Sequence, residues 1–157
     1  MSAETPDERT AWDRTLEEAT EMASDLRHGN WEVTVVRAGH VAAVAPDSGT
    51  ELSGLIHIAP DDTGADLQSF LERGSLDQYS IYRRTIGRNL FLVTRISDPE
   101  SRLAVILVGA VDLDRARSLA EHAHTSGEIQ LHVRLLDGTH LATFYHENPE
   151  HIFPEER

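Results

Sequence analysis

The first thirty residues repeat apolar positions with the period of an α-helix. In an α-helix, with its period of 3.6 residues, five apolar side chains would lie on one face. They are Trp12, Leu16, Ala19, Ala23 and Leu26. Thr5, Pro6 and Glu8 form a capping box with proline at the first helical position, and Gly29 is a stop signal. The pattern predicts a helix over residues 6–28 whose opposite face is acidic.

Beyond this helix, eight stretches show strand-like alternation or short apolar runs, and two more have helical periodicity. The strands are expected at residues 31–39, 53–60, 78–86, 89–97, 102–111, 128–136 and 139–146, and the helices at 61–74 and 112–127. The stretch 40–46 is either a short strand or an extended connection. Tight turns at Gly87, Asp98 and Asp137 predict that the strands they join are antiparallel. The expected fold is a single α+β domain over residues 1–157, with one antiparallel sheet of about five to seven strands and three helices packed on it.

The net charge of the chain excludes some classes of binding partner. Asp and Glu total 27 against 14 basic residues, a net charge of −13, and every basic residue is arginine. Such a surface repels nucleic acid and anionic membranes, which need clustered cations, so neither is expected as a partner. An acid-rich chain without lysine is typical of a protein adapted to a very salty cytoplasm, because molar salt screens self-repulsion. No apolar run approaches the ~20 residues of a membrane span, and a cytoplasmic location is expected.

Several catalytic chemistries are excluded by residue type. The chain has no cysteine and no lysine, which removes thiol nucleophiles, disulfides, Schiff bases and the phosphate-binding P-loop. The G-x-S-x-G and G-x-G-x-x-G patterns are also missing. No cofactor, catalytic residue or metal ligand is therefore assigned.

Four of nine histidines lie between residues 131 and 151. A two-residue Asp137-Gly138 turn would pair His132 with Thr143 and place His132 on the face opposite His140 and His146. His140 and His146 would share a face but lie ~20 Å apart at 3.3 Å per residue. The predicted register therefore argues against one metal or catalytic site built from these histidines, while a cluster drawn from distant segments stays open.

One hairpin departs from the acidic background. Residues 78–97 hold four arginines and no acid, and the Gly87-Arg88 turn places aromatic and guanidinium groups on one face. The candidate interaction patch comprises Tyr82, Arg84, Arg88, Phe91 and Arg95. Guanidinium groups suit carboxylates and phosphates, so an acidic partner, a second copy of the chain or a small anion would fit the patch. The structural alternative is that these arginines neutralise the acidic first helix.

Three stretches carry a family resemblance: "GLIHIAP" (54–60), "SDPESRLAVILVGAVDLDRA" (97–116) and "LLDGTHLATFYHENPEHIFP" (135–154). With them the chain resembles a family of small, acidic haloarchaeal proteins whose domain has no assigned function. The resemblance implies a haloarchaeal cytoplasmic origin and a single α+β domain, and it brings no activity or ligand.

These observations favour a non-enzymatic binding or interaction module, acting on an unknown protein partner or by self-association. The alternative from a different class is a small hydrolase or metal-assisted enzyme that uses a spatial histidine cluster. A structural subunit of a larger complex is a third possibility.

Overall fold

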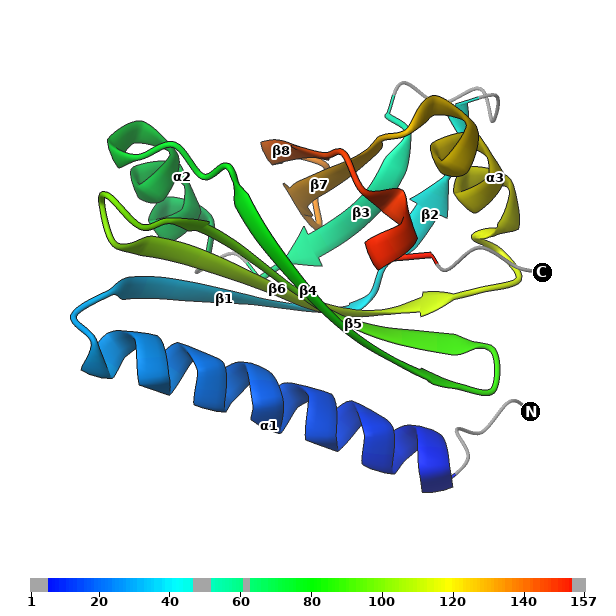
Figure 1. Ribbon diagram of the computed structural model, residues 1–157, viewed down its shortest axis with the longest axis horizontal. Helices are drawn as coiled ribbons and strands as arrows, with labels where there is room; N and C mark the ends of the chain where they lie inside the picture. The colour runs from blue at the N-terminus through cyan, green and yellow to red at the C-terminus, as the bar shows by residue number, and fades with distance from the viewer. Residues whose placement is uncertain (1–5, 47–51, 61–62, 154–157) are drawn as a thin grey trace.

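Two four-stranded sheets pack face to face at the centre of the computed structural model, which describes residues 6–46, 52–60 and 63–153 (Figure 1). The first sheet has the order β1-β6-β5-β4 and comprises β1 (Glu32–His40), β4 (Gln78–Ile86), β5 (Asn89–Asp98) and β6 (Leu103–Asp112). The second sheet has the order β2-β3-β7-β8 and comprises β2 (Ala42–Val44), β3 (Gly54–Ala59), β7 (Ile129–Leu135) and β8 (His140–His146).

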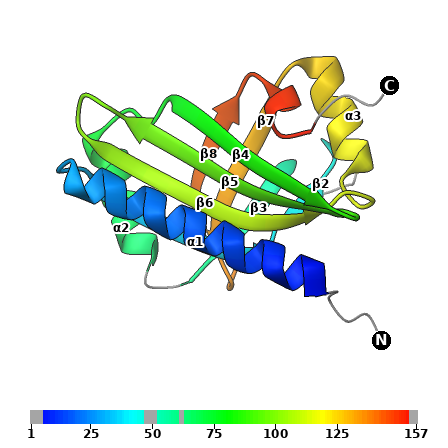
Figure 2. The same cartoon turned by 60° about the horizontal axis from the view of Figure 1, so that its bottom comes forward.

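Helix α1 (Pro6–His28) crosses the outer face of the first sheet, so the layers are helix, sheet and sheet (Figure 2). Its small residues Ala19 and Ala23 pack on Val93, Ile106 and Val108, which point to that face. The proposed N-cap, Thr5, lies outside the described residues. Acidic side chains fill the solvent side of α1, as its periodicity predicted.

Shorter helices close the two ends of the second sheet (Figure 1). They are α2 (Gly64–Arg73), α3 (Arg117–Ser126) and the 3₁₀ turn η3 (Pro149–His151). Helix α3 begins five residues after the predicted start, because the Asp112 carboxylate accepts bonds from the backbone N–H groups of Asp114 and Arg115 and forms a separate turn first. Gly127 ends α3 with φ of +82°, a conformation that suits glycine.

The main core lies between the sheets. Side chains of the first sheet such as Leu92, Ile96 and Leu107 face Leu131 and Phe144 of the second, and all are buried. Strand β6 is buried on both faces because α1 covers one and the second sheet covers the other. The prediction that this strand is central is confirmed.

The prediction of one antiparallel sheet is wrong, although the α+β class and the three helices are confirmed. Strand β1 pairs with β6 in parallel, and β3 pairs with β7 in parallel. Tight turns report only pairs of neighbouring antiparallel strands, whereas a parallel pair joins segments far apart and leaves no local signal. The two long-range pairs divide the strands between two sheets.

The predicted register of the β4–β5 hairpin, which has a two-residue turn, is confirmed. In the β4–β5 hairpin, Arg84 lies opposite Phe91, Tyr82 opposite Val93 and Ser80 opposite Arg95. Gly87 has φ of +60° at the first turn position, as the type II′ turn requires.

The last hairpin departs from its predicted register at one residue. His132 pairs with Thr143 as expected, but Arg134 pairs with His140 because Leu141 forms a β-bulge in β8. The backbone closes the loop with a bond from Leu135 N–H to the Thr139 carbonyl. A one-residue bulge reverses which face the later side chains occupy, and His140 therefore lies on the face of His132.

Candidate functional site

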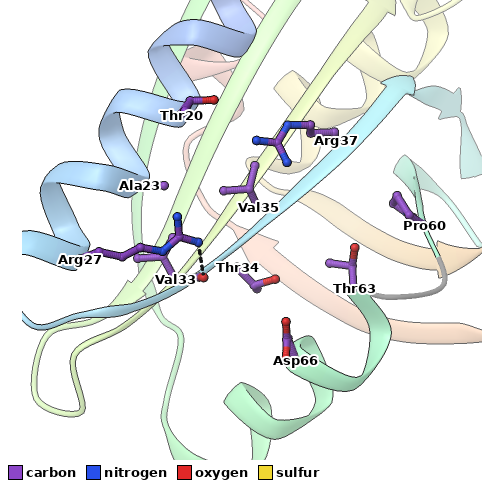
Figure 3. Close-up of a pocket in the computed structure, with 10 residues that line it drawn as sticks. All are labelled: Thr20, Ala23, Arg27, Val33, Thr34, Val35, Arg37, Pro60, Thr63 and Asp66. Atoms are coloured by element: carbon purple, nitrogen blue, oxygen red, sulfur yellow. Dashed lines mark hydrogen bonds between the residues drawn. The ribbon is translucent and has the colours of Figure 1, made fainter.

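A cleft at the edge of β1 brings together side chains from three segments that are far apart in the sequence (Figure 3). We call it the α1–β1–α2 cleft; its volume is about 410 Å³. Its lining comprises Thr20, Ala23 and Arg27 of α1, Val33, Thr34, Val35 and Arg37 of β1, Pro60 after β3, and Thr63 and Asp66 of α2. Strand β1 is an edge strand, which leaves this side of the first sheet open to a ligand.

Two arginines dominate the electrostatics of the cleft. Arg27 reaches from the last turn of α1 and donates from Nη2 to the Val33 carbonyl oxygen at 2.9 Å. Arg37 extends from β1 toward α1, so both guanidinium groups lie over the stretch from Val33 to Val35 (Figure 3). Neither guanidinium has a carboxylate within ion-pairing distance among residues 6–46, 52–60 and 63–153.

Among the other arginines of the described residues, five form an ion pair with a described carboxylate and the rest do not. Arg73 pairs with Glu32 at 2.6 Å, Arg84 with Glu18 at 2.7 Å, and Arg88 with Asp114 at 2.5 Å. Arg27 and Arg37 are distinguished by sharing one cleft, where the two guanidinium groups outnumber the single carboxylate of the described lining, Asp66. A ligand that supplies an anionic group satisfies both.

The opposite wall of the cleft is polar and partly buried. Thr34 and Thr63 are buried, and Thr63 is the N-cap residue of α2 without a side-chain capping bond. The first N–H groups of a helix and its dipole favour an anion. Asp66 in the first turn of α2 lines the same cleft (Figure 3), and its carboxylate oxygens can only accept hydrogen bonds.

Sequence reasoning missed this cleft. Arg27 lies in the last turn of the predicted first helix, and Arg37 lies in a predicted strand with no distinctive motif. The cleft depends on the side of the first sheet that α1 covers and on the position of α2, which the sequence did not reveal. The available signal was weak: Arg27 has no acidic residue three or four positions away on its helix, and Arg37 has none two positions away on its strand.

The predicted interaction patch is divided by α1. Phe91 is buried and packs against Trp12 with ring centroids 6.3 Å apart. Arg84 pairs with Glu18 of α1, and Arg88 pairs with Asp114 at the start of the turn before α3. These three residues are therefore engaged within the protein.

The other two patch residues, Tyr82 and Arg95, are at least partly exposed, as is the Arg88 side chain at 81%. Tyr82 is 45% exposed, and Arg95 makes a 3.3 Å contact with the Ser80 hydroxyl. They line a shallow groove of about 490 Å³ beside α1, and its acidic wall comprises Glu18, Glu21 and Asp25. The groove has mixed charge and an apolar floor of Met22, Leu26 and Val93.

Two histidines that were expected on opposite faces share one polar network. The Thr143 hydroxyl lies 2.9 Å from His132 Nδ1 and 2.7 Å from His140 Nε2. His132 Nε2 lies 2.7 Å from the Ser53 carbonyl oxygen, to which it donates. Neutral His132 then accepts from the Thr143 hydroxyl, which in turn accepts from His140. The prediction that His132 points away from His140 is wrong, because the bulge at Leu141 turns His140 over.

This network bears on the hydrolase alternative. A hydroxyl beside an imidazole is the pair that nucleophilic catalysis uses. However, His132 is only 1% exposed and both of its nitrogens are engaged within the protein. Burial lowers the pKa of His132, and nearby His140 adds to the effect while the Ser53 backbone opposes it. The arrangement is suited to a buried structural network with a neutral His132.

His57 is isolated in the core. It alternates with Leu55 and Ala59 on the inner face of β3, and its side chain is fully buried. Neither ring nitrogen makes a hydrogen bond of good geometry among the described residues, and the nearby His132 backbone offsets only part of the effect of burial on the His57 pKa. Burial lowers the pKa of His57 to about 4, so the imidazole stays neutral at physiological pH.

Comparison with known proteins places the chain in a family. The model of a family of unknown function, DUF7529, matches residues 1–154. The chain belongs to DUF7529. The expected membership in a family without assigned function is thus confirmed, whereas the match carries no information on a haloarchaeal source. No curated protein and no solved structure matches this DUF7529 chain.

Two further properties of the DUF7529 chain concern metals and membranes. Within the part of the chain that the structure describes, no three histidine, aspartate or glutamate side chains are grouped to hold a metal ion. None of its described helices has the length and apolarity that a bilayer crossing requires.

Proposed function

We propose that this chain is a non-enzymatic binding module that holds a small organic anion, a carboxylate or a phosphate ester, in the α1–β1–α2 cleft. The observation that carries the proposal is that Arg27 and Arg37 share one cleft without a carboxylate partner among the described residues. Arginine forks bind carboxylates and phosphates through paired hydrogen bonds. The chain as a whole carries a net charge of −13, which repels anions from most of its surface.

The surroundings of the two arginines support binding over chemistry. Thr20 and Thr63 offer hydroxyl groups from opposite walls, and the start of α2 adds backbone donors. Every one of these groups orients or neutralises a ligand. The histidine network around Thr143 lies in the second sheet and does not line this cleft.

Titration calorimetry with citrate and with inorganic phosphate tests the proposal. Arg37→Gln and Arg27→Gln are each expected to weaken binding about tenfold, since one charge-assisted hydrogen bond contributes about 1.5 kcal/mol or more. Arg14→Gln is the matched control, because Arg14 is an exposed arginine of α1 outside the cleft lining. Equal losses in all three variants would show general charge attraction and contradict a site.

A second candidate function is docking of a partner on the predicted hairpin patch, through its exposed residues Tyr82 and Arg95. The exposure of Tyr82 beside an apolar groove favours it, since exposed aromatic and arginine residues are typical of interface centres. Sedimentation of wild type and Arg95→Glu in high salt separates self-association from a monomer. A monomeric wild type would leave only a heterologous partner for this surface.

We also infer that the chain is salt-adapted and cytoplasmic, as the family resemblance implies. Exposed acids on α1 and the complete replacement of lysine by arginine support this. Chemical denaturation in increasing KCl tests it: stability should rise up to molar salt, where the screening length falls to about 3 Å. Stability that is highest at low salt would contradict it.

A further inference from the structure

A second cavity lies at the far end of β8, and its charge is opposite to that of the α1–β1–α2 cleft. We call it the β8-end pocket; its volume is about 650 Å³. Its walls come from the segment before β4, the segment before β7, the end of β8 and η3. Arg83 anchors η3 to β4 by donating to the carbonyl oxygens of Glu150 and His151.

Three carboxylates surround the β8-end pocket. Asp77, Glu128 and Glu147 are exposed lining residues, and none has an ion-pair partner within the described residues. The described lining contains no arginine. The pocket therefore concentrates negative charge in a concave surface, which attracts cations.

A buried imidazole provides the second and independent observation. His146 lines the pocket and is only 3% exposed, yet its Nε2 has no hydrogen-bond partner among the described residues. An unpaired buried polar atom costs free energy. Burial lowers the pKa of His146, and His151 adds to this effect against the opposing Asn148 backbone and the Glu150 and Glu147 carboxylates. Neutral His146 offers one ring nitrogen as an acceptor.

Aromatic rings complete the recognition surface. The Tyr79 and His146 ring centroids lie 4.9 Å apart, and those of His146 and His151 lie 5.6 Å apart. Tyr145 is an exposed aromatic residue in the same lining. Burial raises the pKa of Tyr79 to about 12, with Asp77 adding to the effect, so the phenol stays neutral. The tyrosine rings attract an organic cation through their π faces.

From these contacts we propose that the β8-end pocket binds a small organic cation that carries N–H groups, a protonated primary or secondary amine. The carboxylates neutralise its charge, the rings contact its carbon chain, and one N–H donates to His146 Nε2. A metal ion fits less well, because the described side chains do not group three ligands around one point.

Nuclear magnetic resonance titration with putrescine, an aliphatic diamine, tests the proposal on the full chain. Tetramethylammonium is the matched probe, because it has a positive charge and no N–H group. Putrescine is expected to shift the His146 imidazole resonances and to bind at least about tenfold more tightly than tetramethylammonium. Absence of a shift at saturating putrescine would overturn the proposal.

Substitutions at His146 and Glu147 test separately how the imidazole acceptor and a carboxylate contribute to putrescine binding. His146→Phe keeps an aromatic ring without the acceptor and should lower putrescine affinity about tenfold while leaving tetramethylammonium unchanged. Glu147→Gln should weaken both probes, whereas Glu121→Gln, on the exposed face of α3, should weaken neither. If Glu121→Gln weakened putrescine as much as Glu147→Gln, the attraction would be general and the proposal wrong. If His146→Phe does not fold, the imidazole shift of the wild type and the comparison with Glu147→Gln still show whether the pocket binds putrescine.

Discussion

Thr143 Oγ1 lies 2.9 Å from His132 Nδ1, and this contact ties the middle of β8 to β7. The same hydroxyl is 2.7 Å from His140 Nε2, so one threonine joins two imidazoles from the two strands of the hairpin. Because His132 is buried and also bonded to the Ser53 carbonyl, removal of the hydroxyl leaves a buried nitrogen without its donor. The network is thus expected to stabilise the second sheet.

Thr143→Val keeps the shape of the side chain and removes the hydroxyl. The free energy of unfolding should fall by about 1–3 kcal/mol, the cost of an unsatisfied buried acceptor. Urea denaturation measures the difference. Thr125→Val is the control, because the Thr125 hydroxyl bonds to the Glu121 carbonyl on the exposed surface of α3. If the two variants lost the same free energy, the network would have no stabilising role.

His57 should make the protein less stable in acid. Its pKa is about 4 in the folded chain, whereas an ordinary histidine has a pKa of about 6.5. Between these values the unfolded chain binds a proton that the folded chain excludes. The free energy of unfolding then falls as the pH falls from 6.5 toward 4, by about 3 kcal/mol for this group. Denaturation curves at several pH values measure the slope.

His57→Leu should flatten that slope and leave the protein at least as stable at neutral pH, since the two unpaired ring nitrogens are removed. Exposed His122 of α3 provides the control variant His122→Gln, which should keep the wild-type slope. An unchanged acid loss in His57→Leu would assign the effect to other buried histidines.

Substitution of Gly54 tests the parallel pairing of β3 with β7. It has φ of +122°, and a Cβ atom placed there would lie 2.2 Å from the Gln130 carbonyl oxygen of β7. Gly54→Ala should therefore cost at least about 3 kcal/mol, from backbone strain and overlap together. In Gly138→Ala the φ of +95° is strained but no atom lies within 4 Å, and about 1 kcal/mol is expected. Thermal unfolding that ranked the two variants equally would contradict the close β3–β7 contact.

The ion pair between Glu18 and Arg84 is the contact through which the hairpin patch neutralises a negative charge of α1. Their side chains are 49% and 35% exposed, so solvent and salt screen the pair. A double-mutant cycle with Glu18→Gln and Arg84→Gln should give a coupling of about 0.2–1 kcal/mol at low salt and less in molar KCl. A coupling of zero at low salt would remove the neutralising role from Arg84.

Local sequence signals predicted the β4–β5 hairpin well and the sheet arrangement poorly. Glycine at the Gly87 turn sets the register of that hairpin, so Arg84 falls opposite Phe91 as expected. The parallel partners of β1 and β3 lie far along the chain and involve no turn. Hydrophobic alternation tells which face of a strand is buried, but not which strand lies beside it.

The candidate sites were harder to predict for related reasons. Insertion of Leu141 as a bulge is a backbone event that alternation alone does not reveal, and it reversed the expected side of His140. The α1–β1–α2 cleft joins Arg27 and Arg37 only after α1 has packed on the first sheet. In the hairpin patch, Phe91 and Arg84 contact Trp12 and Glu18 only because α1 packs over this part of the first sheet.

The most direct test of the proposed function is the response of the Arg27 and Arg37 Nε–Hε resonances to added citrate in high salt. We predict that both resonances shift together and saturate with one binding constant, while the Arg14 resonance stays unchanged. If neither the Arg27 nor the Arg37 resonance moves, or if all arginine resonances drift in parallel without saturation, the α1–β1–α2 cleft is not an anion site.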